Sequence, residues 1–307
     1  MADGWDVHTH LVPEELLSGP ELSAAGGKLI VDGEPAVPLG RLADPAALSA
    51  WVDQQHLAGA LVSLPPAALR YHVTGAAAVA WAERANAALA RATVADPRLR
   101  PLATVPLSDP ATAPRVAEAA LATGRFGGLV LGTLPAATAG FADPALTPLW
   151  RLLDGRSGFV FVHPGACPDP RLESYFLGNL LGNPYETALA ASQLLFGGVL
   201  ERFGGITFCL AHGGGATAAV AGRWQRGVDT SRPGLPPGAG PVRPVLRRLL
   251  VDDLVHDPDV VRLLEAVFGP DRVVPGSDWP FPMGADRLDP DRARRTAALV
   301  ERLTRPA

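Results

Sequence analysis

The chain has 307 residues, of which 48% are hydrophobic and 19% charged, so it can bury a large core and is not disordered. Its 33 Gly and 31 Pro follow no fixed period, which excludes a collagen-like chain. The net charge of −4, without a basic block, argues against a nucleic-acid partner or an anionic membrane surface. No apolar stretch approaches the about 20 residues of a membrane span, and the N-terminus does not read as a signal peptide. We therefore expect a cytoplasmic protein.

Short apolar runs recur along the chain, and most are followed by an Ala- and Leu-rich stretch, a pattern typical of βα units around a parallel sheet. The predicted strands span residues 5–8, 60–64, 102–106, 128–131, 159–162, 206–211, 249–252 and 273–276. Helices are predicted over residues 44–57, 75–95, 110–123, 184–203 and 257–268. Eight strands in this alternation indicate a single (β/α)₈ TIM barrel over residues 1–307 rather than an open doubly wound sheet.

Two segments interrupt this alternation. Residues 26–35 read as a hairpin within an insertion, 19–40, that follows the first strand, and residues 228–244 form a Pro/Gly-rich loop after the sixth helix. Both are expected near the mouth of the barrel. A cover, a dimer contact and a simple connection all remain open for them.

Polar side chains stand at the ends of several predicted strands. His8 and His10 are two apart in an extended segment, so both imidazoles point to one face. His163, His212 and Asp278 end later strands, and the C-terminal ends of barrel strands converge on one face. A set of three His and one Asp suits Zn²⁺ and leaves Mn²⁺ or Fe²⁺ as alternatives. Five candidates leave one residue over, and we expect it to transfer protons.

The motifs around these residues point to a family. HTH at 8–10, HP at 163–164, AHGGG at 211–215, VDDLVHDP at 251–258 and GSDWPFP at 276–282 resemble, in order and position, the amidohydrolase superfamily, above all its aminocarboxymuconate-semialdehyde decarboxylase branch. The resemblance covers residues 5 to about 284. It implies that His8, His10, His163 and Asp278 bind one divalent ion and that His212 is the general acid/base, with no organic cofactor.

The number of metal ions in the site can be predicted from whether the fourth strand carries a lysine. Binuclear members of the superfamily bridge two ions through a carboxylated lysine on strand four. The only lysine here is Lys28, which lies in the insertion, and the fourth predicted strand has none. The resemblance therefore implies a mononuclear site.

The resemblance also implies how a substrate is held. Arginine suits bidentate carboxylate binding. Arg41 and Arg223 stand near the positions of the family's substrate-binding arginines, the second of which reaches into a neighbouring subunit, so a homodimer is expected. Trp279 and Phe281 would form aromatic walls.

Metal chemistry alone does not select one reaction. A divalent ion lowers the pKa of bound water to about 7, and His212 could take that proton and return it. The resemblance favours non-oxidative decarboxylation of a small unsaturated or aromatic acid. A hydrolase or hydratase of a lactone, amide or C–C bond on the same scaffold is the alternative, and a metal-binding protein without catalysis is the third hypothesis. The contributions of His72 and His256 stay open.

Overall fold

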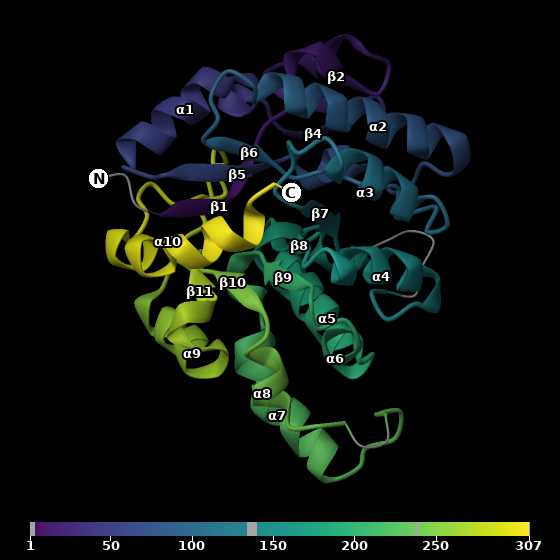
Figure 1. The fold of residues 1–307 in the computed structure, drawn as a ribbon, viewed down its shortest axis with the longest axis vertical. Helices are drawn as coiled ribbons and strands as arrows, with labels where there is room; N and C mark the ends of the chain where they lie inside the picture. The colour runs from purple at the N-terminus through teal and green to yellow at the C-terminus, as the bar shows by residue number, and fades with distance from the viewer. Residues whose placement is uncertain (1–3, 134–139, 237–238, 307) are drawn as a thin grey trace.

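The computed structural model describes residues 4–133, 140–236 and 239–306. Parallel strands occupy its centre, with helices around them (Figure 1). The central strands are β1 (Trp5–His10), β5 (Gly59–Ser63), β6 (Leu99–Pro101), β7 (Leu129–Gly132), β8 (Phe159–His163), β9 (Thr207–Leu210), β10 (Leu250–Asp252) and β11 (Val273–Val274). They pair in the orders β1-β5-β6 and β11-β10-β9-β8-β7.

Backbone contacts join the two sheets into a ring. A parallel bridge links Thr9 to Trp279 beside β1, and another links Ala103 to Leu129 beside β7. Near the first bridge the Val7 amide donates to the carbonyl of Pro275 at 2.9 Å. The predicted (β/α)₈ architecture is confirmed, and the C-terminal strand ends meet at one face.

The third strand was predicted too late in the chain. The prediction was 102–106, whereas β6 ends at Pro101 and pairing continues only to Ala103. At Thr104 the side chain of Asn86 forms the hydrogen bonds that a neighbouring strand would otherwise form. It accepts from the Thr104 amide at 2.8 Å and donates to the Thr104 carbonyl at 2.9 Å. The amide side chain thus ends the ladder before the apolar run ends.

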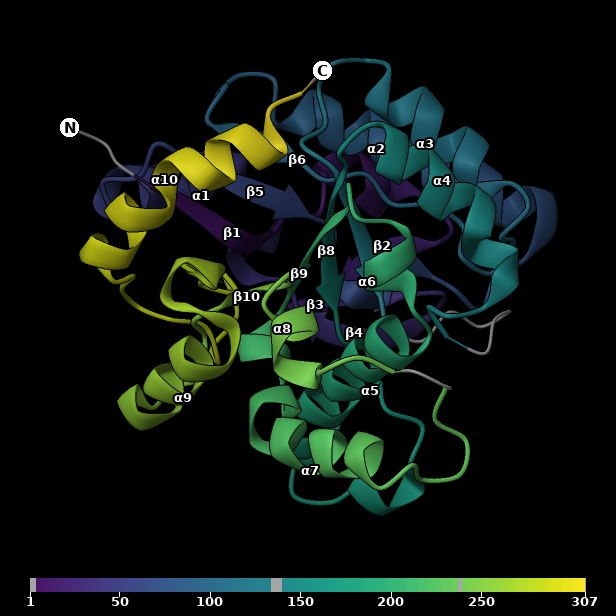
Figure 2. The same cartoon turned by 60° about the horizontal axis from the view of Figure 1, so that its bottom comes forward.

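Helices cover the outside of the ring (Figures 1 and 2). They are α1 (Pro45–Gln54), α2 (Gly75–Ala92), α3 (Ala113–Leu121), α4 (Thr147–Gly155), α5 (Asn183–Phe196), α6 (Val199–Arg202), α7 (Thr217–Asp229), α8 (Val242–Leu246), α9 (Pro258–Phe268) and α10 (Pro290–Thr304). Asp44 caps α1 by accepting from the Ala47 amide, as its Asp-Pro start indicates. None of the described helices is long and apolar enough to cross a bilayer.

The helix predicted over 184–203 is in fact two helices. It breaks between α5 and α6, where Gly198 adopts a φ of 67°. A glycine reaches this left-handed conformation at little cost, so the chain can turn there.

The insertion after β1 is larger than the predicted hairpin. Residues 26–35 belong to a three-stranded antiparallel sheet of β2 (Leu22–Ala25), β3 (Lys28–Val31) and β4 (Glu34–Pro38). Its Leu22 and Leu29 are buried, and Asp32 pairs with Arg70 of the segment before α2. Apolar packing and an ion pair therefore fix this small sheet against the barrel. Of the loop predicted over 228–244, residues 237–238 lie outside the described residues.

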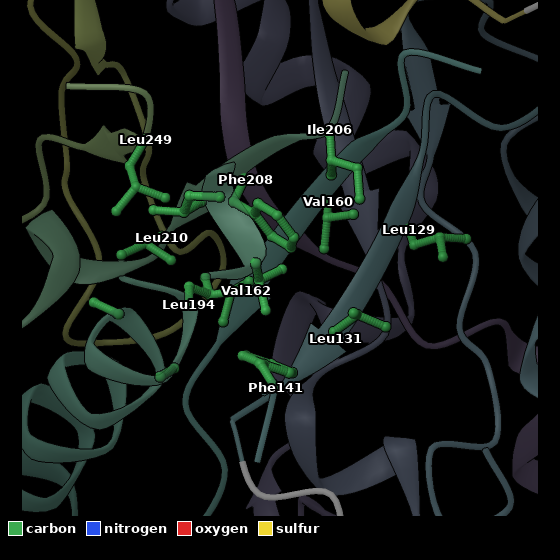
Figure 3. Close-up of a cluster of buried hydrophobic side chains, with 14 of the residues drawn as sticks. Leu129, Leu131, Phe141, Val160, Val162, Leu194, Ile206, Phe208, Leu210 and Leu249 are labelled. Carbon is green, nitrogen blue, oxygen red and sulfur yellow. The ribbon is translucent and has the colours of Figure 1, made fainter. Parts of the chain in front are cut away.

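Alternation along the strands separates two layers of the core. In Figure 3 Val160 and Val162 of β8 lie on one side together with Leu194 of α5. Phe159 and Phe161, which alternate with these valines, belong to a different cluster that includes inward-facing residues of the other central strands. His163 continues the inward series 159, 161, 163, so the strand period places its imidazole at the top of the barrel interior.

Candidate active site

The structure brings the four predicted ligands together. His8 and His10 lie on β1, His163 ends β8, and Asp278 follows β11. One ligand atom from each of these residues lies within 4.8 Å of the others, and all four residues are buried. Segments up to 270 residues apart in sequence therefore meet at the C-terminal face of the barrel.

Each ligand candidate has one buried polar atom without a hydrogen-bond partner: Nε2 of His8, His10 and His163, and Oδ1 of Asp278. The opposite ring nitrogens are held. Nδ1 of His8 lies 2.8 Å from Asp252, Nδ1 of His163 lies 2.9 Å from the Pro164 carbonyl, and Nδ1 of His10 lies 3.1 Å from the Ser63 hydroxyl. Histidine ligands of metals are typically held in this way. Because buried polar groups rarely lack partners, this convergence fits a divalent cation.

Burial and the charges within the cluster shift the pKa values of its members in different directions. Burial alone lowers the pKa of His8, but Asp278 and Asp252 outweigh it and raise that pKa to about 10. Burial lowers the pKa of His10 and, more strongly, that of His163, which also faces His8. Burial opposes ionisation of Asp278, yet the nearby histidines lower its pKa well below the usual value. Without metal the positive charge gathers on His8, and a bound cation would replace it.

His212 lies beside this cluster at the start of a glycine turn. Its Nε2 is 3.7 Å from Oδ2 of Asp278, and its side chain is 18% exposed. The backbone of His212 has a φ of 53°, and Gly213 follows with 64°. A Cβ at Gly213 would lie 2.4 Å from Val255, so only glycine fits this turn.

A cavity of about 300 Å³ opens over His212 and Asp278. It is lined by both polar and apolar groups: Asn179, Leu180, Asn183, Pro184, His212, Gly215, Leu254, Val255, His256, Asp278 and Met283. His256 therefore faces the same space as His212. His72 does not, because it pairs with Asp32 of the inserted sheet.

None of the predicted substrate residues, Arg41, Arg223, Trp279 and Phe281, is among the described residues that line this cavity. The guanidinium of Arg41 lies 5.5 Å from the Trp279 ring centroid, and the Phe281 ring lies 5.4 Å from that of His10. Arg223 is exposed on α7, a helix that extends from the body of the molecule in Figure 1. Among the described residues that line the cavity, none is Arg or Lys.

Asp252 contacts His8 but was not among the site residues predicted from the sequence. Asn183 and Met283 of the cavity wall were also missed. Asp252 had a signal that could have found it, because it too follows an apolar run at a strand end. Asn183 and Met283 had none, since their place depends on how the loops pack.

Known proteins agree with this architecture. The family profile described as Amidohydrolase matches residues 5–304. The chain belongs to this family. A 2-amino-3-carboxymuconate-6-semialdehyde decarboxylase of Dictyostelium discoideum is 36% identical over 145 residues, 46% of this chain and 40% of that protein. The match thus spans less than half the length of this relative.

Two solved structures share the fold. The crystal structure of 5-carboxyvanillate decarboxylase from Sphingomonas paucimobilis matches with a TM-score of 0.83 and 21% identity, covering 100% of both chains. A dihydroxybenzoic acid decarboxylase from Polaromonas, solved with bound manganese and an inhibitor, matches with a TM-score of 0.81 and 18% identity over 99% of this chain and 97% of that one.

Proposed function

We propose that the protein is a metal-dependent, non-oxidative decarboxylase of a small unsaturated or aromatic carboxylic acid. The observation that carries this proposal is the convergence of four unpartnered ligand atoms beside His212 at one cavity. The similar proteins named above, all decarboxylases, support the choice of reaction.

The residues have separate roles in this proposal. His8, His10, His163 and Asp278 hold one divalent ion, which would act as a Lewis acid and lower the pKa of bound water. His212 faces the same cavity and supplies the proton that replaces the departing carboxylate on carbon. The overall change is R–COO⁻ plus H⁺ giving R–H and CO₂, which requires no oxidant or organic cofactor.

The metal is proposed to be Zn²⁺, because three imidazoles and one carboxylate in a four-ligand set suit it. The manganese in the Polaromonas structure makes Mn²⁺ the first competitor. Metal-free protein should be reconstituted with Zn²⁺, Mn²⁺ or Fe²⁺ in turn and assayed. Greater activity with Mn²⁺ or Fe²⁺ than with Zn²⁺ would contradict the assignment.

The reaction is tested by CO₂ release from carboxylated muconates and hydroxybenzoates. We expect release by the metal-loaded protein and a decrease of kcat by about 10²- to 10⁴-fold in His212→Ala with metal content unchanged. His72→Ala is the matched control, because His72 pairs with Asp32 away from the cavity. Hydrolysis of a lactone or amide without CO₂ release from any acid would favour the hydrolase alternative.

A homodimer is proposed to complete the site. Arg41 and a partner's Arg223 would bind the substrate carboxylate, with Trp279 and Phe281 as aromatic walls. The cavity lining described above has no cation of its own, and exposed apolar side chains stand near its mouth, at Tyr175, Phe176, Leu180, Leu181 and Tyr185. A second copy covering this patch would bury it and bring in the missing charge.

Mixed dimers test this arrangement. Arg223→Ala and His212→Ala chains should each be inactive alone. Refolded together in equal amounts, they should recover about a quarter of wild-type activity, because half the dimers are mixed and each of those has one intact site. No recovery on mixing, or full activity of Arg223→Ala alone, would contradict the shared site.

The remaining organisation is proposed from the sequence. Residues 1–307 would form one barrel domain, with 19–40 as its cover and 228–244 as a surface loop, in a cytoplasmic protein. Limited proteolysis that released a stable fragment would contradict the single domain.

A further inference from the structure

Two adjacent carboxylates at the end of β10 face different surroundings. Asp252 is fully buried and points toward β1 and the glycine turn after β9. Asp253 contacts Arg292 of α10 at 2.8 Å and accepts from the Gly276 amide at 3.1 Å. Side chains of successive strand residues point in opposite directions, so the two carboxylates serve different parts of the molecule.

The contacts of Asp252 fix the state of His8. Oδ2 of Asp252 lies 2.8 Å from Nδ1 of His8, and both residues are inaccessible to solvent. Oδ1 accepts from the amides of Gly213 at 2.8 Å and Leu254 at 3.2 Å. An ionised carboxylate only accepts, so Nδ1 of His8 must be the donor. When a metal displaces the second proton of His8, the lone pair of Nε2 is therefore the one directed at the cluster.

The second contact reaches the proposed acid/base. Gly213 directly follows His212 in a turn where both have positive φ. The bond from its amide to Asp252 spans 39 residues of sequence and is buried. One carboxylate therefore contacts a ligand on one side and the His212 turn on the other.

We propose that Asp252 is a positioning residue that sets the tautomer of His8 and holds the turn carrying His212. This inference rests on the proposed metal site. It predicts that metal affinity and the geometry of the acid/base depend on the same buried side chain.

Asparagine at position 252 separates this role from mere packing. If its oxygen faces Nδ1 of His8, its NH₂ group meets the donating amide of Gly213, and two donors face each other. If it is turned round, its NH₂ group faces Nδ1 of His8, which moves the His8 proton to Nε2 and blocks the ligand atom. Neither orientation preserves both contacts, although the shape is nearly unchanged.

The experiment compares Asp252→Asn with Asp253→Asn. Zn²⁺ affinity measured by chelator competition should fall about 10- to 100-fold in Asp252→Asn. In the Zn²⁺-loaded protein the asparagine oxygen must face Nδ1 of His8, so hydrogen exchange at the Gly213 amide should accelerate at least about tenfold. Asp253→Asn should change the affinity less than about twofold and leave this exchange unaltered, even where it lowers the melting temperature.

The outcomes separate the two proposals. Wild-type affinity in Asp252→Asn, or an equal loss in Asp253→Asn, would overturn the role of Asp252 and leave the metal site intact. Failure of the wild type to bind Zn²⁺ would overturn the metal site and this inference with it. If Asp252→Asn does not fold, ¹⁵N NMR of Zn²⁺-loaded wild type decides, because the inference requires His8 to carry its proton on Nδ1.

Discussion

Buried polar groups at two positions along β1 have different roles. The lower level is the surroundings of Asp6, and the upper level is the cluster of His8 and Asp278. At the lower level, Asp6 accepts four hydrogen bonds, from the amides of His8 and Ser277, the Ser277 hydroxyl and Nε1 of Trp51. At the upper level, Nε2 of His8 and Oδ1 of Asp278 lie 3.2 Å apart as an ion pair, and neither forms a regular hydrogen bond within the described residues. Both levels are buried. A saturated carboxylate such as Asp6 holds strands together, whereas convergent unpartnered atoms indicate a place for a ligand.

The largest effect is expected at the upper level. Asp278→Ala should abolish metal binding and lower kcat/KM by more than about 10³-fold, because it removes a ligand and the carboxylate near His212. Metal content by mass spectrometry and CO₂ release measure both. Without metal the variant should also be less stable than the wild type, because Oδ1 of Asp278 lies 3.2 Å from Nε2 of the buried, charged His8 and its removal leaves that charge uncompensated. Unchanged metal binding in Asp278→Ala would place Asp278 with Asp6 as a structural group.

At the lower level, Asp6→Ala should lower the free energy of unfolding by about 3 kcal/mol. The reason is that buried donors of Trp51 and Ser277 lose this acceptor. Urea unfolding of the metal-free protein measures this loss. Metal affinity should change far less than in Asp278→Ala. If the variant kept its stability and lost the metal, the distinction between the two levels would fail.

Metal binding should also stabilise the fold through the upper level. At a free Zn²⁺ concentration 100 times the dissociation constant, the wild type should gain about 2.7 kcal/mol. Asp6→Ala should gain nearly as much, and Asp278→Ala almost nothing. Thermal unfolding with and without Zn²⁺ measures these differences, and equal gains in all three proteins would contradict the proposed ligand set.

The smallest effect concerns pH. Burial raises the pKa of Asp6 above its usual value, although its hydrogen bonds oppose the shift. The folded protein therefore holds this proton more tightly than the unfolded chain, whose Asp pKa is about 3.9. Unfolding free energy should fall as pH rises from that value to the raised one, by at most about 1.4 kcal/mol per pH unit. Asp6→Asn should lack this component, as the difference between the two unfolding curves would show.

Local patterns predicted that His8, His10, His163 and Asp278 lie together, as the structure shows. His8 and His10 share a face because strand side chains alternate, and His163 ends an inward series begun by Phe159. The start of α1 followed from Asp44 and Pro45 in the same way. The end of β6 did not, because the Asn86 side chain, distant in sequence, ends that ladder.

The sequence by itself determined which residues stand at the strand ends and that the strands alternate with helices, because both depend on side chains a few positions apart. Only the tertiary structure decided that Asp252 serves His8, 244 residues away, while its neighbour Asp253 serves Arg292. It also decided that Arg223 stays out of its own chain's cavity. Such partners are set by the closure of the barrel, which brings distant segments together and leaves no local pattern in the chain.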